Sequence, residues 1–256
     1  MTTQDHDALI QDQFTRQAAG FAASRRLHAR EALGFLVDAA GPAPDERSLD
    51  VACGPGSVVC AFAGRLAEAT GLDATAAMLD EARALARREG LANAIFRQGD
   101  VYALPFDDGA FDIVSCRFAV HHFADPARAV AEMARVCRPG GRVLVCDAAA
   151  SDDPDQAATL NAMERMRDPS TATFLTLEAL KALFAAAGLP APSQREYAVA
   201  TEAHDLVANS FPDDPAALTA FIEANAEKLG MDARREGDRI HLTYPAVILT
   251  AVKGQV

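Results

Sequence analysis

The chain has no tryptophan, and aromatic residues of all kinds make up only 6% of its 256 residues. It also has no run close to the roughly 18 uninterrupted apolar residues that a membrane-spanning helix needs. Basic residues are the scarcer charge, because 24 Lys and Arg stand against 36 Asp and Glu, a net charge of −12. Nucleic-acid binding draws on clustered Lys and Arg. We therefore expect a soluble protein with neither a membrane nor a nucleic-acid partner.

The features of a secretory signal and of a metal site are missing as well. The first residues, MTTQDHDALIQDQF, contain no Lys or Arg and no long apolar run, so they do not resemble a secretory signal. The five cysteines form an odd set without the C-x-x-C spacing of zinc or redox sites, and we interpret them as buried free thiols. The expectation is a cytoplasmic protein, monomeric or homodimeric, with no bound metal.

What the sequence does contain is an alternation of helical stretches and short apolar runs. Residues 5–40 are predicted to be helical because apolar residues return at three- and four-residue intervals, and GPAPDER at 41–47 breaks that pattern. Beyond it, the alternation is typical of a parallel sheet covered by helices. The predicted strands are 48–53, a run ending at 72, 94–98, 111–116 and 142–146. The predicted helices between them are 57–67, 76–88 and one that begins at Pro126 after a capping Asp125.

After Asp147 the pattern is looser. The sequence predicts a helix-like stretch to Arg167, helices at 177–187 and 215–229, and β-like runs at 194–200 and 239–252 that add an antiparallel edge. The fold prediction is α/β: a Rossmann-like, doubly wound, mostly parallel sheet with an antiparallel terminal strand, plus N-terminal helices and a small cap. The predicted divisions are an N-terminal helical lid at 1–40, the core at 41–150, and cap helices with terminal strands at 151–256.

The most informative segment is LDVACGPGS at 49–57, which joins a buried strand to a helix. Gly54 and Gly56 let the backbone pass close to a ligand, and the helix start supplies free N–H groups. The alternative is an ordinary strand-to-helix turn. A dinucleotide-binding G-x-G-x-x-G loop would need a third glycine where this chain has Val59. That departure disfavours a nicotinamide-dependent oxidoreductase.

The same segment resembles the D-x-G-x-G-x-G loop of class I S-adenosylmethionine-dependent methyltransferases, with Ala52 in place of the first glycine. Three further segments resemble landmarks of that family, in order and at suitable spacing: GLDAT, QGDVYALPFDDGAFDIV and SCRFAVHHFADP. With RPGGRVLV before the fifth strand and RMRDPS at 165–170, the chain is similar to a bacterial group near the ubiquinone/menaquinone C-methyltransferases, the methyltransferase domain 11 type. The resemblance covers residues 48–147.

The resemblance implies S-adenosylmethionine as cofactor and assigns contacts to it. Asp73 would hold both ribose hydroxyls, because a carboxylate accepts two hydrogen bonds from a diol, and it follows Gly54 by 19 residues. The alternative for Asp73 is capping of the next helix. Asp100 would meet the adenine amino group and Val101 its ring. The full set of predicted cofactor contacts is Phe14, Ala52, Gly54, Asp73, Ala74, Met78, Asp100, Val101, Arg117, Phe118 and His122.

Five residues are candidates for chemistry or for closure of the site. His121 and His122 follow the fourth strand, at the sheet edge where open α/β folds bind ligands, and histidine titrates in the range useful for a general base. His121 is the predicted base and His122 a contact of the cofactor loop; the alternative is that both only orient the loop. Phe14 and Phe21 are predicted to close over the site as a lid, with Phe21 facing the substrate. The alternative is that both only pack the N-terminal helix against the core. Arg167 faces substrate or ends a helix.

The function predicted from these residues is methyl transfer from S-adenosylmethionine to an O, N or C atom of a small molecule, by in-line displacement and with S-adenosylhomocysteine as product. Such a displacement needs alignment in a site closed to water and no metal. Two alternatives stay open. One is a protein of this fold that binds the cofactor but catalyses a non-methylating reaction, and the other is a nicotinamide-dependent oxidoreductase.

Overall fold

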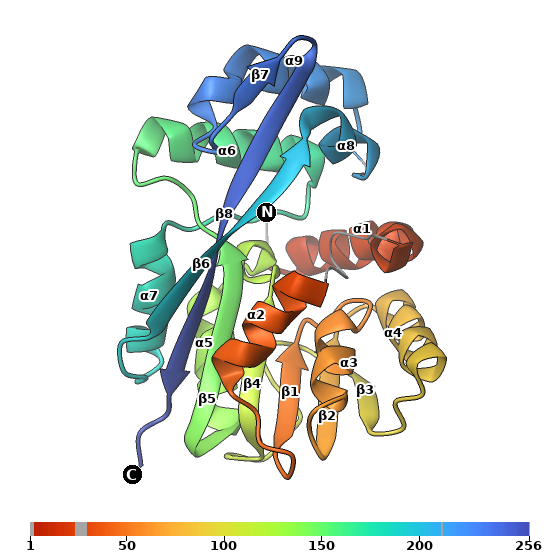
Figure 1. Cartoon of the computed structure of the whole chain (residues 1–256), viewed down its shortest axis with the longest axis vertical. Coiled ribbons are helices and arrows are strands. Elements are labelled where there is room, and N and C mark those ends of the chain that lie inside the picture. Colours follow the sequence, from red (N-terminus) through yellow and green to blue (C-terminus); the bar gives the residue numbers. More distant parts are fainter. Residues whose placement is uncertain (1–2, 24–29, 211, 256) are drawn as a thin grey trace.

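One sheet runs through the molecule, whose computed structural model describes residues 3–23, 30–210 and 212–255, with the side chains of residues 3–5, 7, 21, 23 and 30 excepted. In this described part the sheet has eight strands, in the order β3-β2-β1-β4-β5-β8-β6, with β7 paired to β8 (Figure 1). The strands are β1 (Arg47–Val51), β2 (Glu68–Asp73), β3 (Ala94–Gln98), β4 (Phe111–Arg117), β5 (Cys137–Ala148), β6 (Ser193–Glu202), β7 (Arg234–Glu236) and β8 (Arg239–Val252).

Strands β1 to β5 are parallel, and β8 is antiparallel to both β5 and β6. The α-helices are α1 (Thr3–Ala23), α2 (Arg30–Ala40), α3 (Ser57–Ala63), α4 (Ala76–Glu89), α5 (Pro126–Val136), α6 (Pro154–Arg167), α7 (Leu177–Ala186), α8 (Ala203–Ala208) and α9 (Pro215–Asn225). Two 3₁₀ turns, η1 (Val120–His122) and η2 (Ala226–Lys228), complete the order. This topology confirms the predicted fold class.

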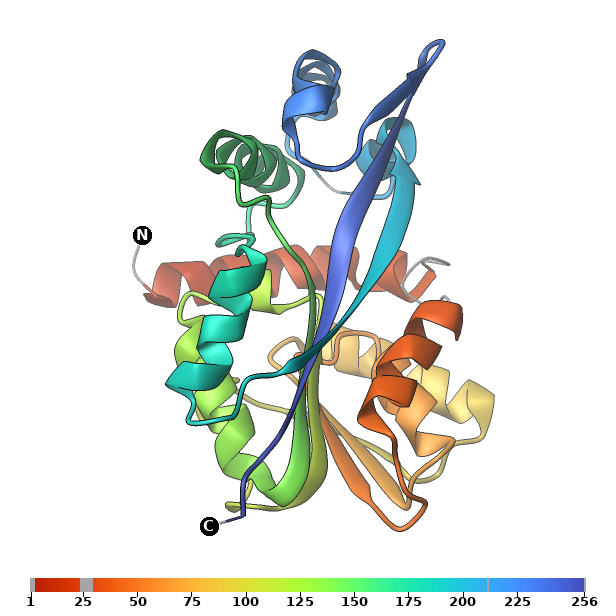
Figure 2. The same ribbon diagram turned by 60° about the vertical axis from the view of Figure 1, so that its left-hand side comes forward.

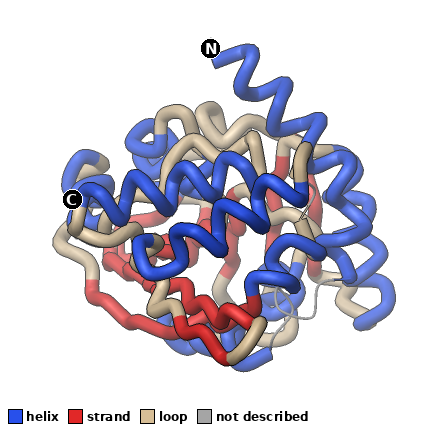
Figure 3. Tube along the Cα trace, turned by 90° about the horizontal axis from the view of Figure 1, so that it is seen from above, coloured by secondary structure: helices blue, strands red, loops and turns tan. Residues whose placement is uncertain are grey.

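Helices cover the sheet on both faces, and each face has its own hydrophobic cluster (Figure 3). On one side, Leu36 and Phe62 from α2 and α3 pack against the sheet with no exposed surface. On the other, Met133 and Phe184 from α5 and α7 are equally buried. Because both faces of the sheet are covered, consecutive residues of β1, β2 and β4 are buried, with no alternation between buried and exposed positions.

Beyond the carboxyl ends of the strands lies the cap, formed by α6, α8, α9 and β7 (Figure 1). It has a third cluster, which includes Leu160, Leu218 and Leu242. Strand β8 belongs to both parts, because residues 246–252 pair with β5 of the core and residues 239–241 pair with β7 of the cap, while residues 241–250 pair with β6 on the other edge. The division at residue 150 therefore stays a prediction.

Helix α1 crosses the carboxyl ends of the parallel strands, between the core and the cap (Figure 2). The His6 ring joins it to η1, with Nε2 2.8 Å from the carbonyl oxygen of His122. Among the described residues, no helix combines the length and apolar character needed to cross a bilayer. From this position, α1 can cover a site at the carboxyl ends of the parallel strands.

Several predicted boundaries were wrong. The helix predicted at 57–67 ends at Ala63, because the Asn93 side chain donates hydrogen bonds to the carbonyl oxygens of Ala63 and Leu66. Strand β5 begins at Cys137 instead of Arg142, because a register shift opposite 111–113 lets the expected turn residues join the sheet. The helix predicted at 215–229 ends at Asn225 and continues as η2. Helix α8 and strand β7 were not predicted.

In the N-terminal region, the structure describes two helices, α1 and α2, over the stretch 5–40 that was predicted to be helical, and residues 24–29 lie outside the described part. Asp125 does cap α5, since its side chain accepts a hydrogen bond from the backbone N–H of Arg128 and Pro126 takes the first helical position. A helix boundary was therefore predicted most accurately where a side chain caps the end of the helix.

Candidate functional site

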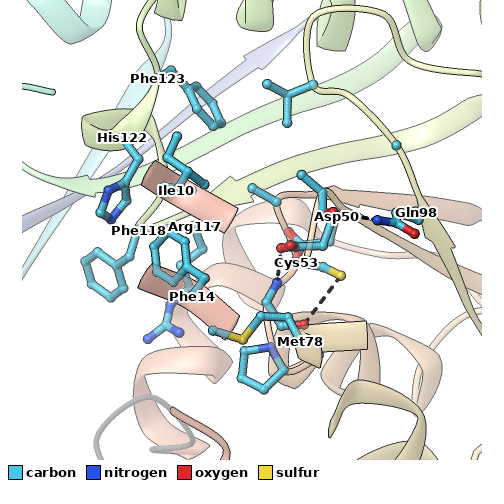
Figure 4. A pocket seen from close by; sticks show the side chains of 18 of the residues that line it. Ile10, Phe14, Asp50, Cys53, Met78, Gln98, Arg117, Phe118, His122 and Phe123 are labelled. Atoms are coloured by element: carbon cyan, nitrogen blue, oxygen red, sulfur yellow. Dashed lines mark hydrogen bonds between the residues drawn. The ribbon is translucent and has the colours of Figure 1, made fainter. Parts of the chain in front are cut away.

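A cavity of about 680 Å³ opens at the carboxyl ends of β1, β2 and β4, beneath α1. Its size is in the usual range for small-molecule sites. All eleven residues predicted to contact the cofactor line it: Phe14, Ala52, Gly54, Asp73, Ala74, Met78, Asp100, Val101, Arg117, Phe118 and His122. We call it the first cavity. Figure 4 shows its two ends, one with Phe14, Phe118 and His122 and the other with Asp50, Cys53 and Met78.

The loop after β1 bends through three left-handed residues, Ala52, Gly54 and Gly56, with φ angles of 56°, 50° and 84°. At Gly54 an added Cβ would meet no atom within 4 Å, and the residue lines the first cavity. At Gly56 an added Cβ would lie 2.8 Å from the Cβ of Ala82. Gly54 is thus the glycine that leaves room for a ligand, whereas Gly56 allows close packing of α3 on α4 and does not line the cavity.

Asp73 ends β2 and points to the same loop. Its Oδ2 accepts a hydrogen bond from the backbone N–H of Gly54 at 2.9 Å, and its Oδ1 accepts one from Thr75 at 2.8 Å. Burial raises the pKa of this carboxyl, opposed by those hydrogen bonds. The N-cap of α4 is Thr75, so the alternative role for Asp73 was wrong. A carboxylate has about four acceptor positions, which leaves room for a diol.

Asp100 and Val101 lie beyond the end of β3 and line the first cavity. The Asp100 carboxylate accepts a hydrogen bond from the backbone N–H of Tyr102 at 2.8 Å, which fixes the turn. Asp100 is exposed and Val101 half-buried. A polar group beside an apolar side chain is an arrangement that can hold the edge and the face of a flat heterocycle.

Asp50, at the end of β1, lines the first cavity and was not among the predicted site residues. Its carboxylate accepts a hydrogen bond from the Ser115 hydroxyl at 2.6 Å, and burial raises its pKa to about 7. The available signal was its position as the first residue of the D-x-G-x-G-x-G-like loop. Perturbed carboxyls in cavities are frequent at functional sites.

A second cavity of about 540 Å³ adjoins the first, between the core and the cap. The two share Phe14, Arg117, Phe118 and His122, which we call the shared wall. The Arg117 guanidinium lies over the Phe118 ring at 4.6 Å, and Phe118 has a φ of 51°. Phe14 meets the His122 ring edge-on at 4.9 Å. The other lining residues include Glu31, Phe35, His121, Arg167, Asp168, Phe174, Tyr197 and Tyr244.

The two histidines of η1 have different surroundings. His121 lines only the second cavity, and its Nδ1 lies 2.7 Å from Oδ1 of the buried Asp147. His122 lines both cavities, and its Nδ1 lies 3.1 Å from the carbonyl oxygen of Ser170. Burial, together with the neighbouring His121, lowers the pKa of His122 to about 3. His122 is therefore a neutral wall residue, while His121 has a carboxylate partner.

Of the two residues predicted to contact the substrate, the structure describes the side chain of only one. Arg167 ends α6 and lines the second cavity, and its Nε donates a hydrogen bond to the Glu164 carboxylate at 2.7 Å. Phe21 is in α1, but its side chain lies outside the described part of the structure. Across the described residues, no group of three or more His, Cys, Asp or Glu side chains is placed to hold a metal ion.

Comparison with known proteins gives this geometry a context. Residues 49–145 match the family model of a methyltransferase domain. The chain is 39% identical over 156 residues to the uncharacterized methyltransferase YcgJ of Bacillus subtilis, which is 61% of this chain and 62% of that protein. It is 37% identical over 115 residues to the ubiquinone/menaquinone biosynthesis C-methyltransferase UbiE of a Ruegeria species, 44% of this chain and 46% of that protein.

Solved structures extend the likeness beyond the matched domain. The crystal structure of the Bacillus subtilis YcgJ protein has a TM-score of 0.80 and 29% identity, covering 89% of this chain and 100% of that one. A putative methyltransferase from Bacillus halodurans has a TM-score of 0.81 and 27% identity, covering 88% of this chain and 100% of that one. The sequence matches to the curated relatives span about half to three fifths of their length.

Proposed function

Residues 49–145 belong to the class I, S-adenosylmethionine-dependent methyltransferases, and from this we propose that the whole chain binds the cofactor in the first cavity and methylates an O, N or C atom of a small molecule. One observation carries the proposal: the eleven residues predicted from scattered sequence segments line a single cavity. Strand ends on a parallel sheet are where open α/β folds bind ligands.

The residues of the first cavity fit this cofactor. Asp73 has acceptor positions left for the ribose hydroxyls, and Gly54 leaves open the space that a side chain would fill. Asp100 and Val101 take the adenine ring. When bound, S-adenosylmethionine supplies an electrophilic methyl group, and the electron pair of the broken bond stays on sulfur. The chain itself has to align the acceptor with that methyl group and exclude water.

The cofactor in the first cavity and the methyl acceptor in the second would meet at the shared wall. Phe14, Phe118 and His122 separate the cavities without belonging to only one of them. An acceptor in the second cavity therefore approaches the first cavity at this wall. We assign α1 the role of lid, because α1 crosses the strand ends (Figure 2) and its Phe14 ring contacts the His122 ring edge-on.

The proposal is tested by calorimetric titration of the protein with S-adenosylmethionine and S-adenosylhomocysteine. Replacing Asp73 by Ala removes hydrogen bonds to a charged acceptor worth about 1.5–3 kcal/mol, so both affinities fall roughly ten- to a hundredfold. Asp80→Ala is the matched control, since that carboxylate is on the exposed face of the adjacent α4 with 78% of its side chain accessible.

Two results would contradict the proposal. Unchanged binding in Asp73→Ala would show that the ribose lies elsewhere. Binding of a reduced nicotinamide cofactor, with no binding of S-adenosylmethionine to the folded protein, would return the oxidoreductase alternative. Transfer of labelled methyl from the cofactor to a product separates a methyltransferase from a protein that only binds the cofactor.

A further inference from the structure

A long loop at residues 99–110 joins β3 to β4, and we call it the adenine loop because it carries the residues proposed to hold the adenine. Its first residues, Gly99, Asp100, Val101 and Tyr102, line the first cavity. Across residues 99–110, all of which the structure describes, there is no helix or strand. Ordering such a segment costs conformational entropy. Contacts from elsewhere in the chain therefore have to hold the loop in place.

Two side chains of α5, Glu132 and Arg135, contact the second half of this loop. The Arg135 guanidinium donates hydrogen bonds to the carbonyl oxygens of Leu104 and Phe106, both at 2.9 Å. The Glu132 carboxylate accepts a hydrogen bond from the backbone N–H of Leu104, also at 2.9 Å. The same carboxylate accepts two hydrogen bonds from Arg135, at 2.7 and 2.8 Å, so each side chain fixes the other. We call these two side chains the α5 clamp.

The α5 clamp holds the loop mainly through backbone groups. Arg135 also pairs with the Asp108 carboxylate at 2.7 Å, but 81% of that side chain is exposed, so water screens this pair. The hydrogen bonds from Arg135 hold the pKa of Glu132 below its usual value, so the two clamp residues stay charged near neutral pH. Contacts with backbone groups fix the path of the loop, and with it the residues that precede Leu104.

The start of the adenine loop is attached to the same helix through Tyr102. The Tyr102 hydroxyl accepts a hydrogen bond from the backbone N–H of Asp125 at 3.2 Å, and the Arg128 guanidinium lies over the Tyr102 ring at 5.4 Å. The backbone N–H of Tyr102 donates a hydrogen bond to the Asp100 carboxylate at 2.8 Å. The Asp100 carboxylate is thus one hydrogen bond away from a residue that α5 holds.

The contacts on α5 lie on one face of the helix. They are spaced by three, four and three residues, a spacing that places helical residues side by side: Asp125, Arg128, Glu132 and Arg135. Their partners are every second residue from 102 to 108, so the loop runs along this face. None of the four α5 residues is among the described residues that line either cavity. Helix α5 therefore acts on the first cavity through the loop.

We propose that the α5 clamp positions the Asp100 carboxylate, with Glu132 and Arg135 as positioning residues, and that this fixed position makes the first cavity select adenine over other purine bases. This inference rests on the proposed function, because it concerns the base of the cofactor. In this assignment the amino group of adenine donates a hydrogen bond to Asp100. In hypoxanthine a carbonyl oxygen replaces that amino group, and the N–H donor lies on the neighbouring ring nitrogen. A carboxylate that is held in place loses its donor, whereas one on a loosened loop can move to the new one.

The test compares calorimetric affinities for S-adenosylhomocysteine and S-inosylhomocysteine, which differ only in the base. The wild type should bind S-adenosylhomocysteine more tightly by roughly ten- to a hundredfold, the effect of one hydrogen bond to a charged group. In Arg135→Met this ratio should fall to about threefold or less, because the carboxylate can follow the donor. Glu132→Gln keeps an acceptor for the Leu104 N–H, so its ratio should lie between those of the wild type and Arg135→Met.

A second measurement separates positioning from a merely structural role. In the wild-type background, Asp100→Ala should weaken S-adenosylhomocysteine binding by roughly tenfold or more. In the Arg135→Met background the same substitution should weaken it by about threefold or less, since the carboxylate is no longer fixed at the base. If Arg135 only supported the fold, the two effects would be additive.

The matched control is Arg83→Met. Arg83 on α4 also pairs with an acid three residues away, Asp80, and it donates a hydrogen bond to the carbonyl oxygen of Phe96 in β3 instead of the adenine loop. This variant should leave the ratio of the two affinities unchanged. Circular dichroism checks the folding of every variant. Arg135→Lys replaces Arg135→Met if the latter does not fold, because Lys keeps the charge but loses the two-pronged geometry of the guanidinium.

The results that would overturn the inference differ from those that would overturn the proposed function. A folded Arg135 variant that keeps the wild-type ratio, with an additive effect of Asp100→Ala, would show that the α5 clamp does not position the carboxylate. Equal binding of the two ligands by the wild type would leave the cofactor site in place and remove the selection of adenine. Binding of neither ligand to the folded wild type would overturn the proposed function, and this inference with it.

Discussion

The two adjoining cavities are built in different ways. The first takes most of its lining from short segments that directly follow β1, β2, β3 and β4, so each segment is positioned by the end of a strand. The second draws on residues from Phe14 to Tyr244, contributed by the core, the lid helix and the cap. Strand ends of one parallel sheet have a fixed relation to each other, whereas the cap elements do not. The first cavity therefore follows from the sheet, and the second from how the rest of the chain packs around it.

The two cavities also differ in the chemical groups that line them. The first cavity has three carboxyl groups, those of Asp50, Asp73 and Asp100, which come from three successive strand ends. The second has aromatic rings and one histidine–carboxylate pair. Carboxyl groups suit a ligand with hydroxyls and positive charge, and aromatic rings suit a flat neutral ring. The shared wall is where the two kinds of lining meet.

The largest expected effect is on the first cavity alone, from Gly54→Val. The side chain would enter the space left open at Gly54, and a β-branched residue at a φ of 50° is strained. We expect S-adenosylhomocysteine binding to weaken by roughly a thousandfold or more, about 4.1 kcal/mol. Isothermal calorimetry measures the affinity, and circular dichroism checks that the variant is folded.

Gly237→Val is the matched control for backbone strain. Gly237 has a φ of 60°, its added Cβ would also meet no atom within 4 Å, and it belongs to neither cavity. It should lose some stability and keep its affinity. A folded Gly54→Val protein with wild-type affinity would mean that the ligand does not approach the loop after β1.

This difference also explains what the sequence could predict. Gly54 and Asp73 were predicted from local residues and a 19-residue spacing, and both line the first cavity. Asp147 was missed, since it comes from β5 and reaches His121 only through the fold, across 26 residues of sequence. Phe35 and Tyr197 were missed for a similar reason: their helix and strand carry no sign that they meet above the sheet, where their rings lie 5.7 Å apart.

A smaller effect is expected from Asp50→Asn, on stability. Burial raises the pKa of Asp50 from 3.8 to about 7, so between these values the folded protein holds a proton that the unfolded chain has released. The free energy of unfolding should therefore fall as pH rises through this window, and Asn should remove that fall. We expect the variant to gain at most about 4 kcal/mol relative to the wild type at pH 8 and little at pH 4, measured by urea unfolding.

Asp112→Asn should change the free energy of unfolding in the opposite direction. Burial raises the pKa of Asp112, but the hydrogen bonds from Arg138 and Arg47 outweigh it and hold the pKa below 3.8. Its ionised form is stabilised in the folded state, so the variant should lose stability above pH 4. If both variants showed the same pH dependence, Asp50 would be ionised in the folded protein at pH 6.

The smallest effects are expected from two substitutions, each of which should affect ligand binding in only one of the two cavities. Phe35 lines only the second cavity, and Val101 lines only the first. Phe35→Leu removes one ring and should weaken the binding of 4-nitrophenol, a planar aromatic probe, by about 0.5–1.5 kcal/mol without changing S-adenosylhomocysteine binding. Val101→Ala removes two methyl groups at the proposed adenine position and should weaken S-adenosylhomocysteine binding by about 1 kcal/mol without changing the binding of 4-nitrophenol. Calorimetry on both variants with both ligands gives the four affinities.

The pattern of those four affinities decides between two architectures. If each substitution affects one ligand, cofactor and acceptor sites are energetically separate and meet only at the shared wall. If Phe35→Leu weakens both ligands equally, α2 and the cap reach the first cavity through a common movement, and the two cavities have to be treated as one site. Separate sites would allow the acceptor to vary among proteins of this fold while the strand-end loops stay the same, since the second cavity alone is assembled from the lid helix and the cap.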